Sequence, residues 1–275
     1  MYRARDILDL VSSLKEKGEP FALATVVRTV AATAAKAGAK AVILPDGSIT
    51  EGWIGGGCAR GAVVKAARDA LLNGESRLVS VQPEDLLDAN GGSAGELKEG
   101  VRFARNTCPS QGTMDIFVEP MLPRPEIVVC GSSPVAVAIA ELGRRLGLVM
   151  TACAPAAEQA AFADPDRRIE RYALPVAGEG TRYIVVSTQS RGDDAALQAA
   201  LSVESDYVAF VGSRKKAATL RAKLRDKGVD PARLERLKAP AGLDLGAITP
   251  EEIALSILAE IVMVRRKRQR AVAEA

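Results

Sequence analysis

The second half of the chain is organised around the stretch Glu126-Ile127-Val128-Val129-Cys130-Gly131-Ser132-Ser133-Pro134. Its first five residues predict a buried strand, and the glycine and serines that follow predict a tight turn into a helix over about 135–146. Further apolar runs at 148–152, 182–187 and 207–211 each predict another short strand. Short apolar strands that alternate with helices favour a doubly wound, Rossmann-like parallel sheet.

The turn after the first strand resembles the phosphate-binding fingerprint of dinucleotide-binding folds. That fingerprint reads G-x-G-x-x-G/A, and here the match is Gly131-Ser132-Ser133-Pro134-Val135-Ala136, with serine in place of the second glycine. A site for NAD also normally has an acidic residue at the end of the second strand. This chain has Cys153-Ala154 there, and Glu158 is the nearest carboxylate. The pattern therefore disfavours ordinary NAD-dependent dehydrogenase chemistry.

Two other predicted strands are also followed by polar loops, which begin at Thr188 and Gly212. Each loop alone could be a capped helix start with a solvated basic face. Three such loops at the carboxyl edge of one sheet favour a binding crevice instead. The residues expected to bind a nucleotide-containing cofactor are Gly131, Ser132, Ser133, Pro134, Thr188, Gln189, Arg191, Gly212, Ser213, Arg214 and Lys215.

The first half of the chain predicts a small α+β domain. Its expected elements are a helix over about 4–17, strands near 21–28, 41–44, 49–54, 76–81 and 114–118, and a helix that ends near Gly74. The proline-rich segment 119–125 predicts an extended linker. We therefore expect an N-terminal domain over 1–122 and a nucleotide-binding domain over 123–275.

The run Gly55-Gly56-Gly57-Cys58 places a thiol at the predicted start of the helix in the first domain. Gly55, Gly56 and Gly57 would let the backbone approach a ligand closely, and the N–H groups of a first helical turn favour an anion or a thiolate. The alternative is a glycine-rich turn that ends in a buried, inert cysteine.

Composition excludes several classes of protein. The chain of 275 residues has no histidine, which removes Ser-His-Asp triads, His-assisted cysteine nucleophiles and histidine-ligated zinc. Its four cysteines show no CxxC spacing, so structural zinc and thioredoxin-like motifs are disfavoured. A net charge of +3 gives no reason to expect nucleic acid as a partner. Neither a membrane-spanning stretch nor a signal-peptide pattern is seen, and we expect a cytoplasmic protein.

Four motifs together resemble the XdhC/CoxI family, whose members are accessory factors for molybdenum hydroxylases such as xanthine dehydrogenase and carbon monoxide dehydrogenase. The motifs are Gly52-Trp53-Ile54-Gly55-Gly56-Gly57-Cys58, Thr107-Cys108-Pro109-Ser110-Gln111-Gly112-Thr113, Val211-Gly212-Ser213-Arg214-Lys215-Lys216, and the segment 239–254, APAGLDLGAITPEEIA. The first two are most similar to the CoxI and CoxF accessory proteins of carbon monoxide dehydrogenase. The segment 30–40 departs from the family, whose members often carry Gly-Ser-Thr and a Pro-Gly pair there.

The resemblance implies a maturation factor. Such a protein would bind the molybdenum cofactor as a molybdopterin dinucleotide, assist its sulfuration or the assembly of its metal site, and deliver it to an apo molybdenum hydroxylase. A sulfur-donating enzyme is a further expected partner, and we expect a homodimer. The resemblance implies a cofactor chaperone rather than a turnover enzyme.

We hypothesise that Cys58 and Cys108 approach each other near the cofactor as a thiol pair, and that Cys58 contacts the molybdenum. Cys130 and Cys153 end adjacent predicted strands and are expected in the core. Two alternatives remain open. One is a thiol oxidoreductase that uses a flavin, as FAD, or a nicotinamide dinucleotide, and the other is a nucleotide-sensing regulator.

Overall fold

The computed structural model describes residues 6–89, 93–109, 111–176 and 180–273. The chain divides into two compact units. Unit 1 comprises residues 1–123 and 269–275, and unit 2 comprises residues 124–268. The fold class predicted from the sequence is confirmed, because a mixed α+β unit is followed by a parallel, Rossmann-like unit. Among the described residues, no helix is both long and apolar enough to cross a membrane.

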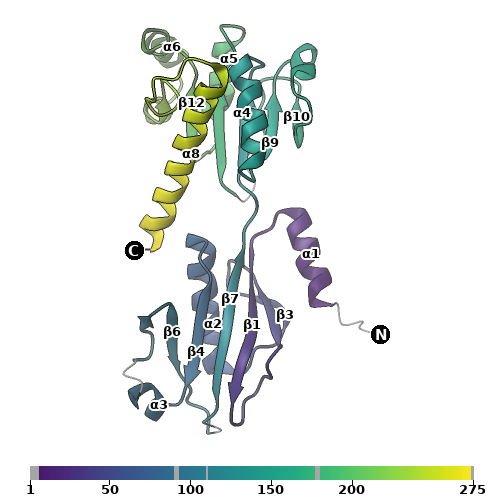
Figure 1. The fold of residues 1–275 in the computed structure, drawn as a ribbon, viewed down its shortest axis with the longest axis vertical. Coiled ribbons are helices and arrows are strands. Elements are labelled where there is room, and N and C mark those ends of the chain that lie inside the picture. The colour runs from purple at the N-terminus through teal and green to yellow at the C-terminus, as the bar shows by residue number, and fades with distance from the viewer. Residues whose placement is uncertain (1–5, 90–92, 110, 177–179, 274–275) are drawn as a thin grey trace. The chain divides into compact units, whose positions relative to one another are not determined.

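Unit 1 is a mixed sheet with strand order β3-β2-β1-β7-β4-β6-β5 (Figure 1). All neighbouring strands are antiparallel except β4 and β6, which are parallel. The strands are β1 (Phe21–Val30), β2 (Lys40–Ile43), β3 (Ile49–Gly52), β4 (Arg77–Gln82), β5 (Leu97–Lys98), β6 (Val101–Arg105) and β7 (Thr113–Met121), and the helices are α1 (Ile7–Lys17), α2 (Gly57–Asn73) and α3 (Glu84–Ala89).

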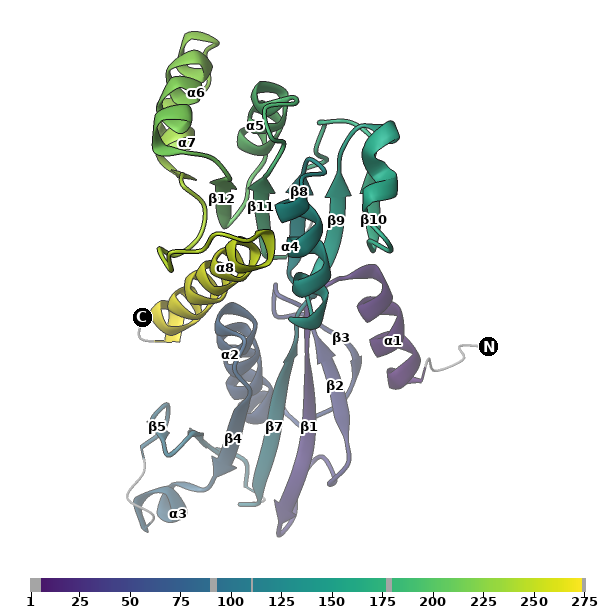
Figure 2. The same ribbon diagram turned by 45° about the horizontal axis from the view of Figure 1, so that its top comes forward.

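Helix α2 packs across β7, β4 and β1, as Figure 2 also shows. Its buried stripe consists mostly of alanine, at Ala59, Ala66, Ala67 and Ala70, with Val63 among them. These small residues at helical spacing let the helix lie close to the sheet. The helix begins directly after Gly56 and ends at Asn73, and Gly74 caps it with a left-handed backbone. The start of α2 is thus held firmly by the core of unit 1.

The segment 119–125 is not wholly a linker, because β7 continues to Met121. Pro120 lies within the strand, opposite Ala22 of β1. On the other side of β7, pairing with β4 stops at Val118. Proline lacks an N–H group and is tolerated where one side of a strand is unpaired. That one-sided pairing explains why the sequence predicts the end of this strand too early, at 118.

Unit 2 is an all-parallel sheet with strand order β10-β9-β8-β11-β12-β13. Counted along the unit this order is 3-2-1-4-5-6, the arrangement of dinucleotide-binding Rossmann folds. The strands are β8 (Glu126–Cys130), β9 (Val149–Cys153), β10 (Arg167–Ile169), β11 (Arg182–Val186), β12 (Tyr207–Phe210) and β13 (Leu237–Lys238).

Helices cover both faces of this sheet. One face packs against α4 (Pro134–Arg145) and α8 (Pro250–Ala273), which lie in front of the strands in Figure 2. The other face packs against α5 (Asp193–Ser202), α6 (Arg214–Asp226) and α7 (Pro231–Glu235). A short 3-10 helix, η1 (Ala156–Ala161), follows β9. Because both faces are buried, the sheet can present polar groups to a ligand only at its strand ends.

The opposite, amino-terminal edge of this sheet contains a buried ion pair. Arg182 donates through Nε to Glu126 Oε2 at 2.7 Å, and Thr151 Oγ1 donates to Glu126 Oε1 at 2.6 Å. The Arg182 side chain is only 7% exposed. Arg167 approaches the same carboxylate at 3.5 Å, but its side chain is 65% exposed. The two arginines thus share one partner, but only Arg182 is buried, and it also donates to the Pro175 carbonyl at 2.8 Å.

We expect Arg182→Met to lower the free energy of unfolding by about 3–5 kcal/mol, because it leaves the Glu126 carboxylate buried without its main partner. Arg167→Met is the matched control and should cost less than about 1 kcal/mol, since its pair is exposed. Urea denaturation followed by circular dichroism measures both. Equal losses in the two variants would contradict the argument from burial.

Candidate functional site

The carboxyl edge of the unit 2 sheet has a switch point between β8 and β11, where the strand order reverses direction. Gly131 follows β8 with φ of 101°, a conformation that favours glycine. A Cβ at this position would lie 2.5 Å from the backbone oxygen of Ser187, at the end of β11. The turn therefore has to be glycine for the chain to pass so close to the neighbouring strand.

The two serines after Gly131 are already engaged within the protein. The Ser133 hydroxyl caps α4 by accepting from the N–H of Ala136, and it lies 2.6 Å from the Ser187 hydroxyl. The Ser132 hydroxyl donates to the Glu158 carboxylate of η1. Pro134 is the first residue of α4. The structure thus brings the predicted residues to the switch point and links them to Glu158, the carboxylate nearest the end of β9.

The loop after β11 is held by one buried carboxylate. Asp193 accepts from the Thr188 hydroxyl and from the N–H of Ser190, and its Oδ2 lies 2.6 Å from Lys216 Nζ. Gln189 and Ser190 both have positive φ, of 49° and 73°. Asp193 and Lys216 were not among the predicted site residues, although both follow closely on the predicted binding loops. Asp193 and Lys216 position the loop that follows β11.

Three predicted cations remain exposed at this edge. The side chains of Arg191, Arg214 and Lys215 make no hydrogen bond or ion pair within the part of the chain that the structure describes. Lys216 instead contacts Ser190 Oγ at 2.9 Å and lies 5.4 Å from the centre of the Phe210 ring. Since α6 also begins here, the edge offers both a helix N-terminus and available positive charge to an anion.

A groove of 770 Å³ adjoins this edge and was not predicted as part of the site. It lies between α6 and the loop 239–247, and Gly212 and Arg214 are among the residues that line it. The loop belongs to the segment 239–254 that carried the family resemblance. The sequence signal for a site here was the pair Gly242 and Gly246 with Asp244 between them. These residues indicate a turn as readily as a binding loop.

The loop is anchored by a second buried carboxylate, that of Glu260 on α8, which is 4% exposed. Glu260 accepts from the Tyr207 hydroxyl at 2.6 Å and from the N–H of Gly242 at 2.9 Å, and it pairs with Lys238 at 3.1 Å. Burial, followed by this carboxylate, raises the pKa of Tyr207 well above its ordinary value. Strand, loop and helix are therefore tied at a single point.

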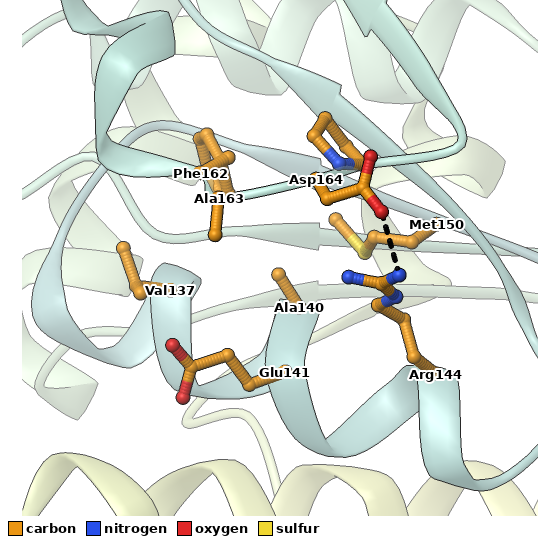
Figure 3. A pocket seen from close by; sticks show the side chains of 9 residues that line it. Val137, Ala140, Glu141, Arg144, Met150, Phe162, Ala163 and Asp164 are labelled. Atoms are coloured by element: carbon orange, nitrogen blue, oxygen red, sulfur yellow. Dashed lines mark hydrogen bonds and ion pairs between the residues drawn. The ribbon is translucent and has the colours of Figure 1, made fainter.

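Another cavity lies away from this edge, between α4 and the segment 162–165, and Figure 3 shows its lining. Its volume is only 20 Å³, and the ion pair between Arg144 and Asp164, at 2.9 Å, closes one side. A space of that size holds about one water molecule. We therefore assign it no ligand.

In unit 1, Cys58 is the second residue of α2, as the sequence predicted. Gly56 precedes the helix, and open space surrounds the points where side chains would project from Gly56 and Gly57. Gly55 has φ of 116°, and a Cβ there would lie 3.1 Å from Met114 Cε. The glycine run thus has one tightly packed member and two that leave room beside the thiol.

The thiol of Cys58 lies 2.9 Å from the hydroxyl of Thr107. Hydrogen bonding to the Thr107 side chain, and then to its backbone, lowers the pKa of Cys58 below its ordinary value. The thiol of Cys108 lies near enough for its charge to oppose this shift. The two motif cysteines therefore come from distant parts of the sequence to one neighbourhood, and the lowered pKa of Cys58 favours its thiolate, the form that acts as nucleophile or soft ligand.

Cys108 is exposed in the loop before β7. Its N–H donates to Asn106 Oδ1 at 2.9 Å, and Asn106 Nδ2 donates to the Gly112 carbonyl at 2.6 Å. Ala32 bridges to Gln111, so the segment that departs from the family pattern adjoins this loop. Ser110 lies outside the described residues. Within the ranges that are described, no cluster of three or more acidic or cysteine side chains forms a metal site.

Cys130 and Cys153 are fully buried and face each other in register on β8 and β9. This confirms their place in the core. Hydrogen bonding to Cys153, together with burial, raises the pKa of Cys130, which makes that thiol unreactive.

Comparison with known proteins identifies the family. Residues 14–82 match the model of the "XdhC and CoxI family", and residues 127–261 match that of the "XdhC Rossmann domain". The chain belongs to this XdhC and CoxI family.

Individual relatives share between a quarter and a third of their aligned residues with this chain. The chain is 28% identical to the uncharacterized protein YqeB of Escherichia coli (strain K12), over 94% of this chain and 46% of that protein. It is 25% identical to a probable xanthine dehydrogenase subunit of Bacillus subtilis (strain 168), over 56% of this chain and 47% of that protein. The chain thus spans about half the length of these curated relatives.

A crystal structure of a xanthine dehydrogenase from Bacillus halodurans aligns over 95% of this chain and 96% of its own. The TM-score is 0.45 and the identity is 17%. Similarity at that level does not bear on function.

We expect Thr107→Val to raise the pKa of Cys58, because the variant removes the hydroxyl that stabilises the thiolate. Alkylation by iodoacetamide, measured against pH in a Cys108→Ser background, should reach its half-maximal rate at higher pH and be slower near neutral pH. Cys130 and Cys153 are buried and should not interfere. Thr107→Ser keeps the hydroxyl and is the control. An unchanged pH profile in Thr107→Val would contradict this assignment.

Proposed function

We propose that the chain is a maturation factor that binds the molybdenum cofactor as a molybdopterin dinucleotide and delivers it to an apo molybdenum hydroxylase. The observation that carries this proposal is the match of family models to both units, one holding Cys58 and the other the nucleotide-type sheet edge. The Bacillus subtilis relative, a probable xanthine dehydrogenase subunit, is consistent with a client of this kind.

The chemistry of the cargo suits the groups at the edge of unit 2. A molybdopterin dinucleotide is a long polyanion with a nucleotide at one end and a sulfur-rich metal site at the other. The exposed cations Arg191, Arg214 and Lys215 and the first turns of α4 and α6 offer charge and N–H donors to its phosphates. Ser133 and Thr188 shape the crevice, since their hydroxyls are bonded within the protein.

We assign Cys58 the sulfur chemistry. Its lowered pKa gives a larger thiolate fraction at neutral pH, and a thiolate is a soft ligand for molybdenum. It can also attack the outer sulfur of a persulfide on a sulfur-donating enzyme. The S–S bond of the donor then breaks, its cysteine leaves as a thiolate, and Cys58 becomes the persulfide. Cys108 is the neighbouring thiol that could ligate with it or receive that sulfur.

The forms of the GWIGGGC and Thr107-Cys108 motifs support a client of the carbon monoxide dehydrogenase type. We further propose that the chain acts in the cytoplasm as a homodimer. Neither feature is needed for the binding and sulfur steps, and each can be tested separately.

A second candidate function is a thiol oxidoreductase that uses FAD or a nicotinamide dinucleotide. The strand order 3-2-1-4-5-6 favours it, because that arrangement binds many dinucleotides across the same switch point. In that case Cys58 and Cys108 would exchange electrons with the bound dinucleotide through a reversible disulfide. Ligand content of the purified protein separates the two functions.

We expect protein purified from cells that make molybdenum cofactor to carry pterin and molybdenum, and Cys58→Ser to carry several-fold less molybdenum, since serine is not a soft ligand. Metal analysis and pterin fluorescence measure both contents. Cys130→Ala is the matched control, because it removes a buried thiol of unit 2 and should leave both contents unchanged. Bound flavin without pterin would favour the oxidoreductase, and equal molybdenum in Cys58→Ser and the wild type would remove the role of the thiol.

A further inference from the structure

The groove beside α6 has the dimensions of a small-molecule site. Its 770 Å³ lies within the range of about 300–1,000 Å³ typical of ligand pockets. All of its lining residues belong to unit 2. They come from the end of β12, from α6 and β13, from the loop 239–247 and from the first turns of α8.

Three cationic residues line the groove. Arg214, Arg221 and Lys238 line it, but Arg221 donates to the carbonyl of Leu237 and Lys238 pairs with Glu260. Arg214 is exposed, and its side chain makes no hydrogen bond or ion pair in the described ranges, which leaves its guanidinium available. It is also the first residue of α6, where backbone N–H groups favour an anion. The guanidinium N–H groups of Arg214 and the N-terminal N–H groups of α6 could both donate hydrogen bonds to a phosphate here.

Apolar residues also line the groove. Leu243, Leu245 and Ile253 line it, and Leu245 is 57% exposed. Exposed leucines in a concave surface suit a flat, weakly polar body better than a hydrated, flexible chain. Asp244 is the acidic residue in the lining. Its carboxylate can accept hydrogen bonds from the amino or ring N–H groups of a heterocycle.

The walls of the groove are fixed before any ligand binds. Ala241 N–H donates to the Phe210 carbonyl at 3.0 Å, and Leu243 N–H donates to the Ser256 carbonyl at 3.2 Å. Gly242 is held by Glu260, and a Cβ at this position would lie 2.3 Å from the Ser256 hydroxyl. A loop tied to strand and helix in this way loses little conformational freedom when a ligand enters.

We propose that this groove binds a phosphate ester of a planar nitrogen heterocycle. The phosphate lies at Arg214 and the start of α6, and the ring lies against Leu243, Leu245 and Ile253, with its N–H groups toward Asp244. This inference rests on the proposed function and adds to it that the groove receives one end of the dinucleotide. A pterin and a nucleobase share the required chemistry, and the experiment distinguishes them.

The test is isothermal titration of the full chain with 5′-GMP, 5′-CMP, 6-hydroxymethylpterin phosphate, guanosine and inorganic phosphate. We expect at least one of the three esters to bind more tightly than either inorganic phosphate or guanosine. Arg214→Gln should weaken ester binding by about 10- to 100-fold, as expected for loss of a charged hydrogen-bonded pair. Leu245→Asn should weaken the esters but not inorganic phosphate.

Arg225→Gln is the matched control, because Arg225 is an exposed arginine near the other end of the same helix and does not line the groove. It should bind the esters like the wild type. Preference for the pterin ester assigns the groove to the pterin end, and preference for a nucleotide assigns it to the nucleotide end. Equal weakening by Arg214→Gln and Arg225→Gln, or esters that bind no better than inorganic phosphate, would overturn the proposal.

The outcome is separable from that of the proposed function. If molybdopterin dinucleotide co-purifies with the chain but Arg214→Gln and Leu245→Asn leave ester binding unchanged, the function stands and the groove assignment fails. If the esters bind through Arg214 and Leu245 but no pterin co-purifies, the groove assignment holds and the proposed cofactor, molybdopterin dinucleotide, is wrong.

Discussion

Burial of both faces of a parallel sheet is the constraint on which unit 2 depends. With α4 and α8 on one side and α5, α6 and α7 on the other, no polar group can reach a ligand through either face. Polar chemistry is confined to the strand ends. At the switch point the segments that follow β8 and β11 come so close that only glycine fits at residue 131, beside the Ser187 carbonyl.

Two buried carboxylates then organise this edge. Asp193 holds the loop after β11 and draws Lys216 toward it, while Glu260 joins β12, β13 and the loop 239–247. Each uses its charge internally, so neither is free for a ligand. The cations Arg191, Arg214 and Lys215 are left exposed, and the edge is basic as a result. An anionic ligand is therefore favoured.

Unit 1 fixes the position of a thiol through core packing. The alanine stripe of α2 packs tightly on the sheet and fixes the helix start, so Cys58 has a defined position. Thr107 reaches it from the loop before β7 and lowers the pKa of Cys58. The cysteines of the core, Cys130 and Cys153, have no such access. Position within the fold, rather than residue type, separates the accessible thiols from the buried ones.

The sequence alone determined the parallel sheet of unit 2, the helix start at Cys58 and the family, because apolar periodicity and glycine-rich turns are local signals. It ended β7 too early, at 118, since the one-sided pairing at Pro120 depends on strands distant in sequence. It likewise missed the roles of Asp193 and Glu260 and the groove beside Arg214. Only tertiary structure decided these, because they arise from contacts between segments that no local pattern encodes.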